Sequence, residues 1–255
     1  MAGNREKDWG KEKKFREGQE LQVLDTLFFD FIDLANELKP KVVVAENVKG
    51  LLLGEAKQYV IKIYKAFDEA GYTCQHFLLN ASKMGVPQRR ERVFFIALRK
   101  DLAPKFMEYV DMFTELPKLE LEFNENEIPF KEIFEKGNKE RMLTGKTKEL
   151  WNNKEVSDTG LSEASGRLYN KPNNYFGCGF VKLNNVVNTI IANDTLVLYD
   201  EQRHLSKKEL CKIGSYPLDY NFLKIKPHYL IGMSVPPLMT GKIAEQIHKQ
   251  WLSKL

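Results

Sequence analysis

Between residues 20 and 98, the spacing of the apolar residues alternates between that of a helix and that of a strand. Helical spacing is found at residues 20–38 and 55–70, and strand-like runs occupy residues 42–45, 73–80 and 93–98. Lys39-Pro40 ends the first helix, because proline disfavours helical backbone at the residue before it. The run Val42–Ala45 is apolar on both faces, which predicts a parallel strand covered by helices on both sides. The alternation as a whole predicts an α/β fold.

Composition excludes several classes of protein. Hydrophobic residues make up 43% of the 255 residues, which excludes a disordered or low-complexity chain. The longest clean apolar run, Val93–Leu98, is far shorter than the roughly 20 residues that cross a bilayer, so we expect no membrane span. The polar start, Met1–Asp8, predicts no secretory signal. Cys74, Cys178 and Cys211 are too few and too scattered for a disulfide framework, which favours a reduced, cytoplasmic protein. The net charge of +4 permits an anionic partner without requiring one.

The character of the sequence changes after Asp101. An acidic stretch and a segment rich in Asn, Gly and Tyr follow, with short strand-like runs at residues 186–192 and 195–199. We expect three parts: residues 1–101 in one domain, residues 102–202 in a smaller, irregular, β-leaning lobe, and residues 203–255 returning to the first domain. Helical spacing at residues 206–213, and at Met239, Ile243, Ile247 and Trp251, predicts two helices in the last part.

Two segments carry residues suited to catalysis. Glu46 directly follows the apolar strand, at the carboxyl edge of the sheet, where open α/β folds bind ligands. Arg90 and Arg92 are two residues apart, so on extended backbone they point to the same side. Their guanidinium groups could then form bidentate hydrogen bonds with a phosphate or a carboxylate. Structural roles fit the same residues: Glu46 could end a strand, and Glu91 could neutralise an arginine.

Two later segments are equally ambiguous when taken alone. In Arg203–Leu210, Ser206 and Glu209 have the spacing of a capping box at the start of a helix. In Gly232–Pro237, the glycine permits a tight turn and the prolines begin the last helix. Each segment suits an ordinary structural role as well as a ligand site.

Together and in this order, these segments resemble the motifs of the cytosine-C5 DNA methyltransferase family. Glu46-Asn47-Val48 resembles its ENV motif, and Gln88–Arg92, preceded by Gly-Val-Pro, resembles its QxRxR motif. Arg203–Leu210 is similar to the motif after the target-recognition region, and Gly232–Pro237 is similar to the final GNSVPP motif, with Met233 in place of the usual Asn. Thr189-Ile190 stands where the recognition region carries a Thr-Leu or Thr-Ile pair. The resemblance covers residues 1–103 and 185–250. It implies part of a Rossmann-like S-adenosylmethionine-dependent methyltransferase sheet plus a small, irregular, β-rich target-recognition lobe.

The resemblance implies a DNA (cytosine-5-)-methyltransferase of the bacterial type, in a restriction-modification context. The target cytosine is flipped out of double-stranded DNA, a cysteine thiolate attacks C6, and C5 takes a methyl group from S-adenosylmethionine. No metal takes part. The implied roles are as follows: Glu46 engages the ring, Arg90 and Arg92 hold the catalytic loop and the flipped nucleotide, Met233 and Ser234 line the cofactor, and Gln88, Arg203 and Thr189 contact DNA.

Two of the family's motifs have no match. None of the three cysteines follows a proline, as the family's nucleophile does, and the glycine-rich cofactor loop is also missing. We therefore expect the C-terminal portion of such an enzyme, inactive alone. It could be one part of a split enzyme whose complementary N-terminal polypeptide supplies the cysteine, the product of a broken gene, or an incomplete sequence. Strand 41–46 should then have an unpaired edge, and the final helix should lack the partner near the first strands against which it packs in the family.

Two other functions stay open. The lobe at 102–202 could act as a non-catalytic, sequence-specific DNA-binding module, with the stretch 169–180 reaching base edges. Methylation of tRNA, by the family's RNA-modifying branch, is less favoured because its Cys-Phe-Thr signature is not found.

Overall fold

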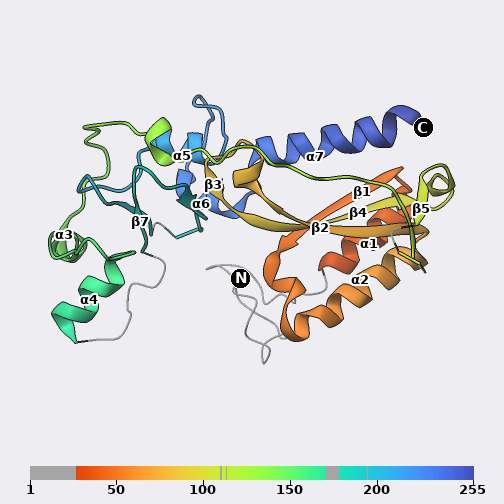
Figure 1. The fold of residues 1–255 in the computed structure, drawn as a ribbon, viewed down its shortest axis with the longest axis horizontal. Helices are drawn as coiled ribbons and strands as arrows, with labels where there is room; N and C mark the ends of the chain where they lie inside the picture. The colour runs from red at the N-terminus through yellow and green to blue at the C-terminus, as the bar shows by residue number, and fades with distance from the viewer. Residues whose placement is uncertain (1–26, 110, 113, 171–177, 194) are drawn as a thin grey trace. The chain divides into compact units, whose positions relative to one another are not determined.

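The computed structural model describes residues 27–109, 111–112, 114–170, 178–193 and 195–255 (Figure 1). Expectations for residues 1–26 and 171–177, which include most of the Asn- and Tyr-rich stretch, lie outside the described residues. The chain forms two compact units. The first consists of Met1–Leu79, Glu91–Leu121 and Gln246–Leu255, and the second of Asn80–Arg90 and Glu122–Glu245. Residues 203–245 thus group with residues 122–202 in the second unit.

A three-stranded sheet organises the first unit. Its strands are β1 (Val42–Val48), β4 (Glu91–Arg99) and β2 (Tyr72–Asn80), in the order β1-β4-β2. The pair β1–β4 is antiparallel, from Val42 opposite Leu98 to Val48 opposite Arg92. The prediction of a parallel strand at this position is therefore wrong, because an apolar run shows burial but not strand direction.

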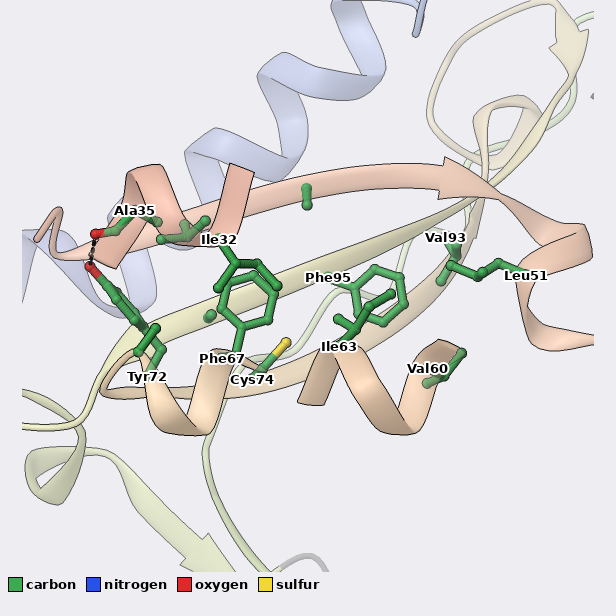
Figure 2. Packing of buried hydrophobic residues seen from close by; sticks show 14 of the residues in the cluster. Ile32, Ala35, Leu51, Val60, Ile63, Phe67, Tyr72, Cys74, Val93 and Phe95 are labelled. Atoms are coloured by element: carbon green, nitrogen blue, oxygen red, sulfur yellow. Dashed lines mark hydrogen bonds between the residues drawn. The ribbon is translucent and has the colours of Figure 1, made fainter. Parts of the chain in front are cut away.

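Two helices cover one face of this sheet. They are α1 (Leu27–Leu38) and α2 (Lys57–Glu69), and both fall within ranges predicted to be helical. Figure 2 shows their buried side chains meeting those of β1, β2 and β4 in one cluster, in which Phe67 and Phe95 are fully buried. The hydroxyl of Tyr72 anchors β2 to the end of α1 by donating to the carbonyl oxygens of Ala35 (3.3 Å) and Pro40 (2.8 Å).

Strand β1 lies at an edge of this sheet. Among the described residues, β4 is the strand that pairs with β1, so the predicted unpaired edge is confirmed for that part of the chain. Val44 points away from the α1–α2 cluster and is 42% exposed. Helix α1 adds an exposed apolar stripe at positions spaced three and four apart, namely Leu27, Phe31, Leu34 and Leu38.

The end of the chain is buried along one face of its last helix. Helix α7 (Pro237–Gln250) buries Met239, Ile243 and Ile247, and Trp251 follows it with no exposed surface. Trp251 Nε1 donates to the carbonyl oxygen of Lys118 at 2.7 Å. The first unit also contains an antiparallel ribbon of β5 (Met107–Tyr109) and β6 (Glu115–Pro117).

The second unit is built from short elements. Its helices include α3 (Gly145–Asn152), α4 (Leu161–Tyr169), α5 (Lys207–Ile213), α6 (Pro227–Met233) and the part of α7 up to Glu245. Two parallel pairs join β3 (Gln88–Arg89) to β8 (Val187–Asn188) and β7 (Phe180–Val181) to β9 (Val197–Leu198). The lobe is thus less β-rich than the sequence suggests: the strand-like runs at 186–192 and 195–199 form two residues of strand each, and α3 and α4 lie in the part expected to lean towards β.

Candidate active site

Glu46 and Arg92 meet on neighbouring strands of the sheet. Val48 of β1 lies opposite Arg92 of β4, and Glu46 lies two residues before Val48, so alternation places all three on one face. Arg92 Nε lies 2.8 Å from Glu46 Oε1. The two side chains keep 15% and 33% of their surface exposed, respectively, so the ion pair borders solvent. Desolvation lowers the pKa of Arg92, and the charge and hydrogen bond of Glu46 partly restore it.

The charged side chains next to the Glu46–Arg92 ion pair do not compete with it. Lys49 Nζ pairs with Glu91 Oε2 at 2.9 Å, so Glu91 binds a lysine rather than neutralising an arginine side chain. Arg92 also donates from Nη1 to the carbonyl oxygen of Glu91, at 2.7 Å. A carboxylate held in this way has a fixed orientation and suits hydrogen bonding to a planar heterocycle.

Arg90 makes a separate set of contacts, within the second unit. It is 2% exposed, and its two terminal nitrogens each donate at 2.9 Å, to the carbonyl oxygens of Ile190 and Gly232. Arg90 thereby links the segment after β8 to α6. Of the predicted arginine pair, the structure brings Arg92 to Glu46 and commits Arg90 to backbone carbonyls.

Two of the three predicted DNA contacts are buried. Gln88 is 1% exposed, accepts from Ile190 N (3.0 Å) and donates to Ile213 O (3.3 Å). Arg203 is fully buried and lies 2.7 Å from Glu209 and 2.6 Å from Glu201. Burial alone would lower the pKa of Arg203, but the hydrogen bonds and charges of the two glutamates raise it. In this conformation both side chains hold the lobe together and do not reach a solvent-facing ligand.

Thr189 is the remaining predicted DNA contact, and it is partly exposed. Its hydroxyl donates to the carbonyl oxygen of Arg89 at 2.5 Å, beside the β3–β8 pair. Its position at the surface is compatible with a DNA contact. Its neighbour Arg89 was not among the predicted site residues, although the alternation of a strand that buries Gln88 must turn Arg89 outward.

The capping box predicted at residue 206 is confirmed. Ser206 Oγ accepts from Glu209 N at 3.1 Å, and Glu209 Oε2 accepts from Ser206 N at 2.8 Å. The carboxylate of Glu209 also accepts two hydrogen bonds from the guanidinium of Arg203. The start of α5 and the buried ion pair therefore form one network.

Met233 and Ser234 lie where α6 ends. Met233 is 62% exposed. Ser234 Oγ donates to the carbonyl oxygen of Ile231 (3.0 Å) and accepts from the hydroxyl of Tyr216 (2.8 Å). Its proton is therefore committed, and towards a ligand this hydroxyl can act as an acceptor. An acceptor hydroxyl of this kind is compatible with a ligand that carries an ammonium group.

None of the three cysteines has the environment of an activated thiolate. Burial raises the pKa of Cys74 well above its usual range and also raises the pKa of the half-buried Cys178. The same effect raises the pKa of Cys211, although the charge of Lys207 opposes it. A catalytic cysteine needs the opposite shift, because the thiolate is the nucleophile.

No group of three or more His, Cys, Asp or Glu side chains in the described part of the chain is placed to hold a metal ion. No helix within the described ranges has the length and apolar character needed to cross a membrane.

Comparisons with known proteins identify the family of the chain. The model of the C-5 cytosine-specific DNA methylase family matches residues 8–249. Type II methyltransferase M.FnuDI of Fusobacterium nucleatum is 47% identical over 76 residues, which are 30% of this chain and 22% of the relative. M.NgoPII of Neisseria gonorrhoeae is 44% identical over 80 residues, which are 31% of this chain and 24% of the relative. These alignments thus span about a quarter of the length of the curated relatives.

Solved structures support the fold. A DNMT2 variant from Spodoptera frugiperda matches with a TM-score of 0.59 and 18% identity, over 92% of this chain and 76% of that one. The methyltransferase EhMeth of Entamoeba histolytica matches with a TM-score of 0.55 and 15% identity, over 89% of this chain and 68% of that one. The mixed α/β architecture is consistent with the S-adenosylmethionine-dependent methyltransferase fold. With the family model matching nearly the whole sequence, the chain belongs to the C-5 cytosine-specific DNA methylase family.

Proposed function

We propose that this chain supplies the base-binding carboxylate and the DNA-recognition lobe of a cytosine-C5 methyltransferase that acts on double-stranded DNA. The observation that carries the proposal is the Glu46–Arg92 ion pair, which fixes a carboxylate at the solvent border of the sheet. Family membership supports the reaction, and the type II methyltransferases among the relatives support a restriction-modification context. We infer a location in the cytoplasm from the DNA substrate.

The target cytosine is flipped out of the duplex, because its C5 and C6 atoms are inaccessible within the base stack. Glu46 engages N3 and the exocyclic amine of the flipped ring, and Arg92 keeps the carboxyl group in that orientation. This contact makes C6 electrophilic towards a thiolate, and addition there makes C5 nucleophilic. After methyl transfer, loss of the C5 proton to a base and elimination of the thiolate restore the aromatic ring. S-adenosylmethionine, when bound, supplies the methyl group, and Met233 and Ser234 line one side of its site.

The thiolate comes from outside these 255 residues. The proposal rests on the environments of Cys74, Cys178 and Cys211, whose raised pKa values disfavour the ionised form. The donor of the thiolate is a polypeptide segment with the family's Pro-Cys motif, either elsewhere in a longer chain or on a separate, complementary polypeptide.

The test measures transfer of labelled methyl groups from S-adenosylmethionine to duplex DNA and, in parallel, to tRNA. The chain is assayed alone and mixed with a polypeptide that carries the Pro-Cys motif and the glycine-rich loop. We expect methylation of DNA by the mixture and none by the chain alone. Robust methylation by the chain alone would refute the external thiolate, and methylation of tRNA in preference to DNA would refute the substrate. Sequence-selective retention of duplex DNA without methylation by either sample would favour the non-catalytic binding module.

A further inference from the structure

Three donors surround one carboxylate in the second unit. The hydroxyl of Ser82 donates to Glu127 Oε1 at 2.9 Å, and Arg89 Nη2 donates to Glu127 Oε2 at 3.1 Å. Lys83 Nζ lies 3.7 Å from Glu127 Oε1. The hydrogen bonds from Arg89 and Ser82, together with the two positive charges, lower the pKa of Glu127. The cluster is therefore built to stabilise an anion.

The donors and the anion come from different parts of the unit. Ser82 and Lys83 lie on a short turn, Ala81–Lys83, whose start is fixed because the side chain of Asn80 accepts from Ser82 N at 3.1 Å. Arg89 lies on β3, where pairing with β8 turns it and Asn188 outward while Gln88 and Val187 are buried. Glu127 lies on residues 118–129, which form neither helix nor strand. The donors thus sit on ordered elements and the carboxylate sits on a loop.

The charges in this cluster do not balance. Two cations share one carboxylate, and the side chains of Lys83 and Arg89 are 48% and 55% exposed, whereas that of Glu127 is 26% exposed. The other acidic side chain near the turn, Glu125, pairs with Lys242 instead. Ion pairs between exposed groups contribute little to stability, so replacing the carboxylate with another anion costs little. A DNA phosphodiester carries the same single charge and offers two unesterified oxygens to the same donors.

We propose that Ser82, Lys83 and Arg89 form a phosphate-binding site for the DNA backbone, and that Glu127 occupies it in the DNA-free chain. The inference rests on the proposed function, since it names a contact through which the recognition lobe holds its duplex. Binding of DNA exchanges the internal carboxylate for a phosphodiester and releases the loop around Glu127.

The experiment measures the affinity of the full chain for a fluorescein-labelled DNA duplex by fluorescence anisotropy over a series of salt concentrations. Arg89→Ala should weaken binding and reduce the slope of log Kd against log salt by about 0.9, the value for one lost phosphate contact. Arg89→Lys, which keeps the charge, should retain the slope. Glu127→Gln should tighten binding several-fold at low salt, and adding Arg89→Ala to it should abolish that gain. Lys65→Ala is the matched control, because Lys65 is an exposed lysine paired with Glu69 on α2.

Each outcome decides between this site and the alternatives. An unchanged slope in Arg89→Ala, with the wild-type chain bound to DNA, overturns the phosphate site and leaves the proposed function standing. If Glu127→Gln lowers the thermal unfolding midpoint and does not tighten binding, Glu127 only stabilises the fold. The proposed exchange of its carboxylate for a DNA phosphodiester is then wrong. If the wild-type chain does not bind the duplex at all, the phosphate site proposed here is overturned, while methylation by the mixture with the Pro-Cys polypeptide still decides the proposed function.

Discussion

At the scale of the residue, the strongest constraint in the second unit is the buried charge of Arg203. Two carboxylates neutralise it, and it also donates to the carbonyl oxygens of His204 and Glu135. Replacing Arg203 with Ala leaves Glu209 buried without its cation. We expect a loss of about 3–5 kcal/mol in the free energy of unfolding, the usual effect of breaking a buried ion pair from one side. Urea denaturation measures this loss, with Lys65→Ala as a surface control expected to change stability by less than about 0.5 kcal/mol. A loss of similar size in the control would contradict the assignment.

A second residue-scale prediction concerns acid stability. Asp158 is 2% exposed and receives two hydrogen bonds from Arg167, at 2.8 and 2.7 Å, which lower its pKa below the usual value. Because the folded state binds a proton less readily than the unfolded state, Asp158 contributes stability above its unfolded pKa. That contribution is lost as the pH falls through the folded pKa. Urea unfolding as a function of pH should show this loss for the wild type and a shallower acid dependence for Asp158→Asn. Equal acid dependence in both proteins would be the contrary result.

The residue scale also shows what the sequence could predict about the site. The identities of Glu46 and Arg92 were predicted, and the structure brings the two together. Three side chains expected to face ligands are instead buried, namely those of Gln88, Arg90 and Arg203. The prediction failed because the polarity of a residue does not reveal whether its side chain binds a ligand or a backbone carbonyl. Arg89 was missed, although strand alternation could have indicated it.

At the scale of the element, the sequence pattern predicted the positions of helices and strands better than it predicted how the strands pair. Helices α1, α2, α5 and α7 and strands β1, β2 and β4 all lie close to their expected ranges. The prediction that β1 is a parallel strand was wrong, because strand direction depends on contacts between residues far apart in the sequence. The short strands of the second unit were overestimated because apolar runs such as 186–192 also occur in buried irregular backbone.

The open edge of β1 and the exposed stripe of α1 make an element-scale prediction. Unpaired strand edges next to apolar surface promote association between chains. We expect concentration-dependent self-association of the isolated chain, reduced by Val44→Lys or Leu34→Glu, as measured by light scattering after gel filtration. Ile61→Lys is the matched control, because Ile61 is 70% exposed but lies on α2. Equal suppression by Ile61→Lys would show that general surface polarity, and not this edge, controls association.

At the scale of the whole molecule, family membership and the cysteine environments lead to one account. In the proposed function, Glu46 holds the target cytosine and the second unit holds DNA, while burial raises the pKa values of the chain's own thiols and makes them unsuited to attack. In the mixture with a Pro-Cys polypeptide, Glu46→Gln should lower the rate of methyl transfer by about 10²–10⁴-fold, the usual contribution of a positioned acid–base group. DNA binding by the same variant, measured by anisotropy, should stay unchanged. A wild-type rate of methyl transfer would remove Glu46 from the mechanism.

The measurement that tests the central claim most directly is covalent trapping on a duplex that contains 5-fluorocytosine. Fluorine at C5 cannot leave as a proton does, so the adduct between the attacking sulfur and C6 persists and mass spectrometry can locate it. With S-adenosylmethionine and both polypeptides present, the account predicts an adduct on the cysteine of the Pro-Cys polypeptide. An adduct on Cys74, Cys178 or Cys211 would contradict it.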